Sequence, residues 1–206
     1  SSGSVSLTDI NDGKFPNEVK NITVVTATDG NHGRSVAWGA ERFGCECMIY
    51  MHANVSQARQ EAVEAFGATV IRVDGNYDDS VRQADLDAKE NGWHIVSDTS
   101  YPGYMEVPRD VMAGYTLMTT EAMDQLPESV IPSHVFIQGG CGGLAGAVCA
   151  DLWFRYGKDM PHIVVVEPVP AACLYESAKA GEERIVNITE ESLMAGLSCG
   201  EVSALG

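Results

Sequence analysis

The sequence contains no apolar run long enough to cross a lipid bilayer and has little positive charge. A membrane-spanning helix needs about 20 consecutive apolar residues, so no membrane span is expected. Lysine and arginine number 13 against 29 acidic residues, which gives a formal net charge of −16. Because an acidic surface repels nucleic-acid phosphate and anionic lipid, neither is expected as a partner.

The sequence also lacks the cysteine spacing of a zinc site. None of its six cysteines forms a C-x-x-C pair, and a chain of 206 residues has no need of a disulfide framework. We expect buried free thiols and no metal site, although a Cys173–Cys199 disulfide stays open. The polar start, SSGSVSLTDINDG, shows no signal peptide, and together with the free thiols it favours a cytoplasmic location.

Apolar runs of strand length alternate with amphipathic segments of helix length. The expected strands are 22–28, 45–51, 68–73, 94–98, 134–138 and 162–168. The expected helices are 32–43, 55–66, 77–91, 107–126 and 143–156. This order predicts an α/β fold with parallel sheet covered by helices on both faces, hence three layers. Ligands bind such folds at the carboxyl ends of the strands; the stretch 99–108 is expected to be irregular.

The first candidate site is T-A-T-D-G-N-H-G-R, residues 26–34, where an expected strand gives way to a helix. Gly30 and Gly33 permit a tight turn and a close approach of backbone to ligand. Asn31 offers an amide that both donates and accepts hydrogen bonds. A plain strand-to-helix turn with a side-chain cap is the simpler alternative.

The second candidate site is Q-G-G-C-G-G-L-A-G, residues 138–146, which also follows a strand and opens a helix. Its four glycines in five positions leave successive N–H groups free to point at one anion. The segment is not a P-loop, because no G-K-[ST] follows, and it lies too late in the chain for a dinucleotide fingerprint.

Taken together, the two loops resemble those of fold-type-II pyridoxal-phosphate enzymes, the tryptophan synthase β family. The variant with aspartate at position 29 resembles the diaminopropionate ammonia-lyases within that family. The same resemblance extends from about residue 22 to the end of the sequence. It includes the segments N-Y-D-D-S-V-R (76–82), W-H-I-V-S-D-T (93–99), P-G-Y (102–104), I-V-V-V-E-P (163–168) and M-A-G-L-S-C-G-E (194–201).

The resemblance implies a role for each matching residue. Asn31 is expected to hydrogen-bond the phenolate oxygen of pyridoxal 5'-phosphate, and Asp29 to remove the α-proton of the D-isomer of the substrate. Asp98 is expected to meet the substrate amino group or to position Asp29. A helix N-cap for Asp29 and a strand-end turn for Asp98 are the plain alternatives. The N–H groups expected to wrap the phosphate are those of Gly140, Cys141, Gly142, Gly143 and Leu144.

Two carboxylates in one pocket suit a substrate with two amines, and their mutual repulsion raises the pKa of one carboxyl group, which suits a base. Glu167 is expected either to line the cofactor ring or to anchor a loop. His32 is expected to be a packed, hydrogen-bonded histidine rather than a catalyst.

The expected activity is a carbon–nitrogen lyase reaction that converts 2,3-diaminopropionate to pyruvate and ammonia. The family's Schiff-base lysine lies upstream of the asparagine loop, and neither Lys14 nor Lys20 resembles it. The resemblance therefore implies a chain truncated at both ends, whose own activity is uncertain. The alternatives are a serine or threonine dehydratase, or a non-catalytic module that binds a small anion or another subunit.

The resemblance also implies a division into domains. Residues 29–108 are expected to form much of a smaller α/β domain, and residues 1–28 and 109–206 part of a larger, cofactor-binding one. Sheet edges or apolar helix faces left exposed in an incomplete fold lead us to expect self-association, such as a homodimer.

Overall fold

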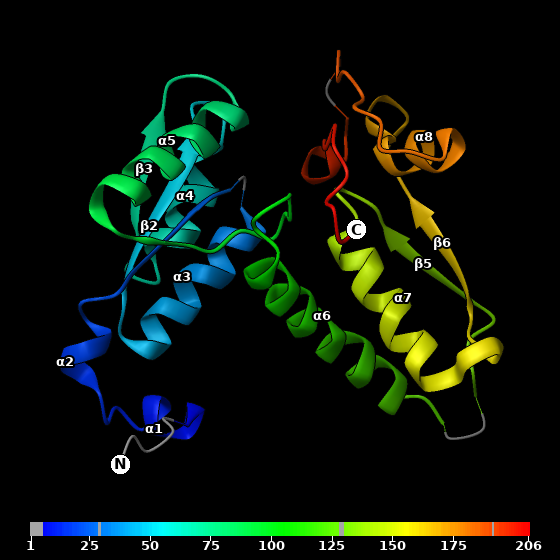
Figure 1. The fold of residues 1–206 in the computed structure, drawn as a ribbon, viewed down its shortest axis with the longest axis horizontal. Coiled ribbons are helices and arrows are strands. Elements are labelled where there is room, and N and C mark those ends of the chain that lie inside the picture. Colours follow the sequence, from blue (N-terminus) through cyan, green and yellow to red (C-terminus); the bar gives the residue numbers. More distant parts are fainter. Residues whose placement is uncertain (1–5, 29, 128–129, 191) are drawn as a thin grey trace. The chain divides into compact units, whose positions relative to one another are not determined.

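The computed structural model describes residues 6–28, 30–127, 130–190 and 192–206. The chain forms two compact units, Ser1–Ser97 and Asp98–Gly206 (Figure 1). Each unit contains parallel strands and helices, so the expected α/β class is confirmed, with the strands divided between two sheets. No helix in the described ranges combines the length and apolarity needed to cross a membrane.

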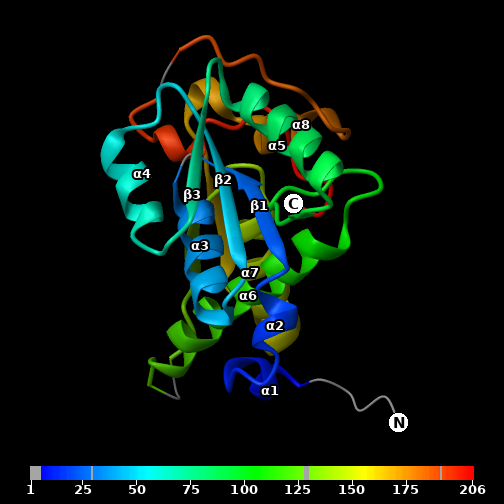
Figure 2. The same cartoon turned by 90° about the vertical axis from the view of Figure 1, so that its left-hand side faces the viewer.

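The first unit is built around a four-stranded parallel sheet in the order β3-β2-β1-β4. Figure 2 shows β3, β2 and β1 lying side by side. The strands are β1 (Thr23–Ala27), β2 (Glu46–His52), β3 (Thr69–Val73) and β4 (His94–Ile95). The helices are α1 (Leu7–Asn11), α2 (Pro16–Val19), α3 (Asn31–Phe43), α4 (Gln57–Glu64) and α5 (Tyr77–Asn91).

Helices cover both faces of this sheet because successive strand residues point to opposite sides. On one face Ile49 and Met51 of β2 pack with Ala37 of α3 and Val63 of α4. On the other face, β2 contributes Tyr50, which packs with Val25 and with Ala84 and Ala88 of α5. The expected three layers of helix, sheet and helix are therefore present in this unit.

The second unit contains a two-stranded parallel sheet, β5 (His134–Gln138) paired with β6 (His162–Val166). Its α-helices are α6 (Glu106–Asp124), α7 (Gly143–Tyr156) and α8 (Cys173–Ala180). Short 3₁₀ turns lie at η1 (Gly157–Asp159), η2 (Val169–Ala171) and η3 (Ala195–Leu197). One face of the sheet packs on α7 through Ile137, Ala145, Val148 and Leu152, and α6 contacts α7.

Two expected strands are shorter than the sequence pattern indicates. The expected strand 94–98 pairs only over β4, because the chain leaves the sheet after the N–H of Val96 donates to the carbonyl of Val25. The expected strand 162–168 ends at Val166, two residues before Pro168, whose ring removes a backbone donor.

The division between units also falls at a different place from the expected domain boundaries. Strand β1 pairs with β2 and β4, so residues 23–27 belong to the first unit rather than with residues 109–206. The expected domains are those of the whole family fold, of which these 206 residues were expected to form only a part. That assignment stays a prediction about the whole protein.

Candidate cofactor-binding site

The first loop is held in place by the hydroxyl of Thr28, directly after β1. The Thr28 Oγ1 accepts the N–H of Gly30 at 3.0 Å and that of Gly33 at 3.1 Å. A Cβ at Gly33 would stand 2.2 Å from the Thr28 methyl carbon, so this close packing requires glycine. Thr28 thereby fixes the turn into α3, a role that the sequence analysis did not give it.

Asn31 is the first residue of α3, and its side chain is exposed. Its amide makes no hydrogen bond with residues in the described ranges, so it is free to contact a ligand. Asp29, the expected base, lies outside the described residues. The neighbouring His32 donates from Nε2 to the carbonyl of Val96 at 2.7 Å, as expected of a packed histidine.

The second loop connects β5 to α7 and has its own fixed geometry. The N–H of Gly139 donates to the carbonyl of Val166 at 2.9 Å, and that of Gly142 to Gly139 at 3.1 Å. Gly142 has φ +99°, a left-handed conformation, and a Cβ there would stand 2.9 Å from the Cα of Gly206. Glycine is therefore required at position 142 both by backbone conformation and by the lack of space.

The loop leaves three of the five expected N–H groups available. The N–H of Gly142 is used within the loop, and that of Gly143 points at the Cys141 sulfur. Within the described part of the chain, the N–H groups of Gly140, Cys141 and Leu144 have no acceptor. Free donors next to the positive end of α7 suit a phosphate, so this loop fits the anionic part of a cofactor.

The carboxyl-terminal residues complete this loop from the other side. The N–H of Ser203 donates to the carbonyl of Cys141 at 2.8 Å, so this carbonyl oxygen of the loop already has a hydrogen-bond donor. The hydroxyls of Ser100 and Ser203, both buried, lie 2.7 Å apart, and the Ser203 hydroxyl also accepts the N–H of Ser100 at 2.9 Å. The N–H of Leu205 donates to the Ser100 hydroxyl at 2.9 Å.

Asp98 lies beside the second loop, within the same unit. Burial, followed by the negative charge of Asp98, raises the pKa of the Tyr115 hydroxyl to about 12. The same charge also disfavours ionisation of the Cys141 thiol. Asp98 is half-buried, and the Thr99 hydroxyl lies 3.5 Å from its Oδ1. The structure therefore places a carboxylate and a phenol, Tyr115, next to the glycine loop.

Glu167 caps helix α8 with both carboxylate oxygens. Its Oε1 accepts the N–H of Leu174 at 2.9 Å and its Oε2 that of Tyr175 at 2.8 Å. These bonds support the anchoring alternative, because they use the carboxylate locally. Contact of Glu167 with a cofactor ring stays a prediction.

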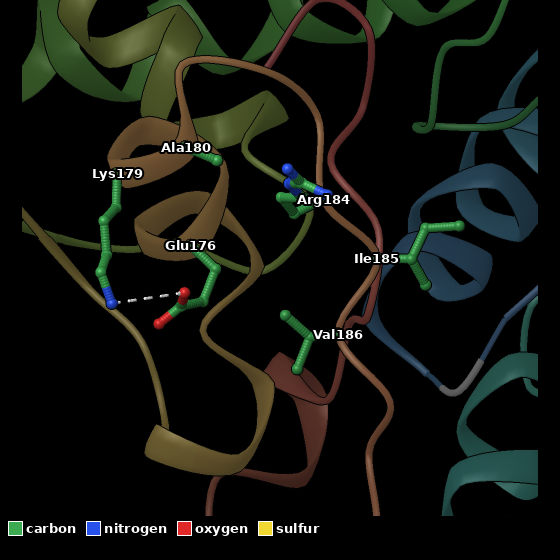
Figure 3. Close-up of a pocket in the computed structure, with 6 residues that line it drawn as sticks. All are labelled: Glu176, Lys179, Ala180, Arg184, Ile185 and Val186. Atoms are coloured by element: carbon green, nitrogen blue, oxygen red, sulfur yellow. Dashed lines mark ion pairs between the residues drawn. The ribbon is translucent and has the colours of Figure 1, made fainter.

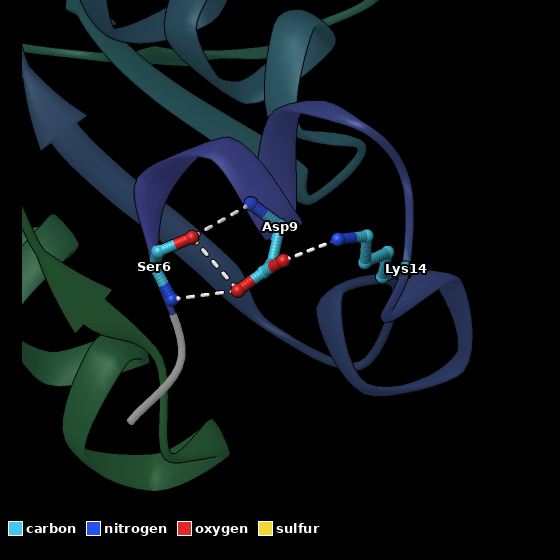
Figure 4. Close-up of polar contacts among 3 residues, drawn as sticks. All are labelled: Ser6, Asp9 and Lys14. Carbon is cyan, nitrogen blue, oxygen red and sulfur yellow. Dashed lines mark hydrogen bonds and ion pairs between the residues drawn. The ribbon is translucent and has the colours of Figure 1, made fainter. Parts of the chain in front are cut away.

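The two lysines near the start of the chain precede the first loop and are exposed. Lys14 pairs with Asp9 at 2.5 Å, and Asp9 also forms a capping box with Ser6 (Figure 4). This ion pair holds the pKa of the Asp9 carboxyl below its usual range. Lys20 follows the end of α2. Lys14 thus has a local structural partner at the first helix.

A surface hollow beside α8 contains basic side chains but none of the expected site residues. It is lined by Glu176, Lys179, Ala180, Arg184, Ile185 and Val186 (Figure 3). Lys179 lies 3.8 Å from Glu176 and Arg184 lies 2.5 Å from Glu182. Because both cations are paired, the hollow offers an anion little net attraction.

Sequence reasoning missed Thr28, Ser100, Tyr115 and Ser203. Thr28 lies within the first candidate motif, residues 26–34, and could have been found from its place at the strand end. Ser100 and Ser203 are 103 residues apart, and no local pattern connects them. Within the described ranges, no three His, Cys, Asp or Glu side chains are grouped so as to hold a metal ion.

Comparison with known proteins connects both loops to one family. A family model described as "Pyridoxal-phosphate dependent enzyme" matches residues 5–205. Diaminopropionate ammonia-lyase of Salmonella typhimurium is 41% identical over 202 residues, covering 96% of this chain and 50% of the relative. Threonine dehydratase 1 of Solanum lycopersicum is 30% identical over 169 residues, covering 82% of this chain and 26% of the relative.

The chain is also similar to a solved structure of diaminopropionate ammonia lyase from Escherichia coli, with a TM-score of 0.83 and 41% identity. The matched region covers 90% of this chain and 47% of the Escherichia coli chain. The chain therefore spans about half the length of the relatives it resembles most among these. Since the family model matches nearly all of its residues, the chain belongs to the family of pyridoxal-phosphate dependent enzymes.

Proposed function

We propose that the whole protein is a pyridoxal-phosphate-dependent ammonia-lyase that converts 2,3-diaminopropionate to pyruvate and ammonia. The observation that carries this proposal is the glycine loop, whose unused N–H groups lie at the amino end of α7. The identity to diaminopropionate ammonia-lyases, at 41%, supports the substrate over the 30% identity to a threonine dehydratase. Because the chain covers about half of those relatives, the activity is assigned to the whole protein.

In this proposal the N–H groups of Gly140, Cys141 and Leu144 hold the phosphate, and the Asn31 amide donates to the phenolate oxygen. The cofactor supplies the electron sink that makes the substrate α-proton removable. Asp29 accepts this proton from the D-isomer. Asp98 attracts a substrate amine, since a carboxylate beside an ammonium group stabilises the charged form of both.

Loss of the α-proton then permits the β-amine to leave. Addition of one water molecule to the remaining enamine gives pyruvate and a second ammonia, so the balance is one diaminopropionate and one water to one pyruvate and two ammonia. Charge supports this substrate class, because each molecule carries two amines and the proposal assigns to it two carboxylates, Asp29 and Asp98. A homodimer, or another form of self-association, and a cytoplasmic location stay predictions.

The test uses the full-length protein with bound cofactor and measures keto-acid release by a coupled lactate dehydrogenase assay. Pyruvate release from 2,3-diaminopropionate, at a kcat/KM well above that for L-serine or L-threonine, supports the lyase. Preferential release of 2-oxobutyrate from L-threonine supports the dehydratase instead. Retention of the cofactor's visible absorbance with no keto acid from any of these substrates would favour a non-catalytic module.

A further inference from the structure

Strands β5 and β6 each begin with a histidine, and the two histidines are neighbours in the sheet. The strands lie side by side (Figure 1), and in their parallel pairing the Cα of His134 is opposite that of His162. The centres of the two imidazole rings are 5.1 Å apart, with an angle of 40° between the ring planes. Both residues are exposed, so the pair of rings is open to solvent.

The ring pair lies on the face of the sheet that α7 does not cover. Val135, Ile137 and Ile163 pack toward α7, and alternate residues of a strand point to opposite faces. Phe136 therefore shares the face of His134, and its exposed ring stacks on the imidazole with the ring centres 6.4 Å apart. This stacking restricts the orientation of the His134 ring.

Hydrogen bonds to Ser133 fix the positions of both histidines. The N–H of His162 donates to the carbonyl of Ser133 at 2.9 Å, which ties the second histidine to the residue before the first. The Ser133 hydroxyl lies 3.1 Å from Nδ1 of His134. When Nδ1–H donates to this hydroxyl, Nε2 of His134 keeps its lone pair. Histidines that bind a metal through one nitrogen usually donate the other N–H in this way.

The other three histidines of the chain have no such neighbour. His32 and His52 both have hydrogen-bond partners in the backbone. His94 is exposed at the start of β4, but the residue opposite it in β1 is Val24. The His162 ring makes no hydrogen bond with the part of the chain that the structure describes, so both of its nitrogens are available to a ligand.

The distance between the two rings fits one shared metal ion. A zinc–imidazole bond of about 2.1 Å puts the ion about 3.2 Å from the centre of each ring. Two imidazoles that meet at a right angle or at the tetrahedral angle then have centres roughly 4.5–5.2 Å apart, and the observed 5.1 Å lies in this range. Imidazole nitrogen suits zinc, copper and nickel ions, and the net charge of −16 favours a cation.

We propose that His134 and His162 form a binding site for a divalent transition-metal ion such as Zn²⁺ or Cu²⁺, with water in the remaining coordination positions. The ion joins β5 to β6 at their amino ends. Because β5 spans five residues, the site lies roughly 13 Å from the start of the glycine loop at the other end of the strand. A two-stranded sheet is marginally stable by itself, so the ion stabilises the strands that carry the loop without touching the loop.

The experiment titrates the full-length protein with Zn²⁺ by calorimetry and follows its thermal unfolding midpoint. We expect one ion bound at this site and a midpoint that rises with the concentration of free Zn²⁺, because a ligand that binds the folded state stabilises it. Replacing one ligand, in His134→Ala or His162→Ala, should weaken this binding about tenfold or more and abolish the rise. The matched control is His94→Ala, at an exposed histidine that also begins a strand, and it should behave as the unmodified protein.

Two results of this titration would overturn the proposal. One is the absence of a Zn²⁺-dependent rise in the unmodified protein. The other is an equal rise in a variant that lacks both His134 and His162, because the ion would then be held elsewhere. Since both side chains are exposed, the unfolding midpoints measured with a chelator present should agree among all the variants, which separates loss of the ion from loss of the fold.

A second measurement counts the imidazoles that bind the ion. With one equivalent of Cu²⁺, electron spin-echo spectroscopy should detect two imidazole ligands in the unmodified protein and one in His162→Ala. A single imidazole in the unmodified protein, or two in His162→Ala, would contradict a shared ion. Neither measurement requires substrate turnover, so their outcomes are independent of the proposed lyase activity.

Discussion

At the scale of single residues, backbone donors dominate the glycine loop, and glycine is what makes them accessible. Gly142 illustrates this, because its left-handed backbone turns the loop into α7 and a side chain there would meet Gly206. The N–H groups of Gly140 and Leu144 stay open to an anion as a result. An anion site of this kind needs no lysine side chain.

Substituting Gly142→Ala should destabilise the protein and weaken its binding of inorganic phosphate. A left-handed conformation costs a non-glycine residue roughly 1–2 kcal/mol, and the contact 2.9 Å from Gly206 adds to that cost. Gly181→Ala is the matched control, because Gly181 has φ +73° and nothing lies within 4 Å of its Cβ position. Denaturant unfolding and phosphate titration of both variants measure the difference; equal phosphate affinity would contradict the role of the loop.

Substituting Asp29→Asn should reduce kcat for D-diaminopropionate while the cofactor absorbance stays unchanged. A positioned general base contributes about 10²- to 10⁴-fold to the rate, and the loss should be of that order. Turnover of the L-isomer should fall less, because Asp29 is proposed as the base for the D-isomer alone. The control is Asp12→Asn, at an exposed carboxyl group that ends α1. Equal losses for both isomers would mean that Asp29 positions the substrate rather than taking its proton.

The site residues divide according to how far their partners lie in sequence. Asn31 and the loop from Gly140 to Leu144 could be identified because glycines and an amide follow apolar strands within a few residues. The Ser100–Ser203 pair could not, because its members meet only through folding. For Glu167 the alternatives were to line the cofactor ring or to anchor a loop, and its hydrogen bonds from the N–H groups of Leu174 and Tyr175 show a local structural use, the capping of α8, that the sequence pattern did not specify.

At the scale of elements, the amino end of α5 shows why some boundaries could be predicted to the residue. The N–H of Asp79 donates to the Asn76 side chain at 3.1 Å, and the N–H of Asn76 donates to Asp79 at 2.8 Å. This capping box begins the helix at Tyr77, and Gly92 follows its last residue, Asn91. Signals at both ends are local, so the expected helix 77–91 agrees with the structure.

The same box predicts an acid-sensitive helix end. The hydrogen bond from Asn76, together with Arg82, lowers the pKa of the Asp79 carboxyl from 3.8. A carboxyl group with a lowered pKa in the folded state stabilises the fold above its unfolded pKa, and this contribution is lost as the pH falls through the folded value. Asp79→Asn should therefore lower the unfolding midpoint at pH 7 and should have little effect at pH 2. The exposed Asp78→Asn is the neighbouring control; an equal effect of Asp79→Asn at both pH values would rule out ionisation as the cause.

Elements with weaker end signals were predicted less accurately. The apolar pattern of 94–98 continues past the point where pairing ends, since β4 keeps only His94 and Ile95 in the sheet. The length of a strand depends on where its neighbour pairs with it. Here Val24 and Val25 of β1 pair with β4, and the residues of β4 alone do not specify that register.

At the scale of the whole molecule, the sequence predicted the α/β class because alternating strands and helices have few other solutions. It did not predict that the strands divide into a four-stranded and a two-stranded sheet. Nor did it predict that the boundary between the compact units falls between Ser97 and Asp98 in the sequence. Assignment of strands to sheets depends on packing between helices and strands distant in sequence. Helix α7, for example, packs against Ile137 of β5 and Ile163 of β6.

The hydrogen bonds between Ser100 and Ser203 have a consequence for the order in which the protein is made. A ribosome synthesises residues 138–146 some sixty residues before Ser203, and a chain folds largely as it emerges, its amino-terminal part first. The first unit can thus form while the glycine loop still lacks Ser203, which hydrogen-bonds Cys141, and Gly206, which packs against Gly142. The nascent chain therefore completes this phosphate cradle only after Ser203 and Gly206 have been synthesised, so the loop gains its final shape no earlier than that point.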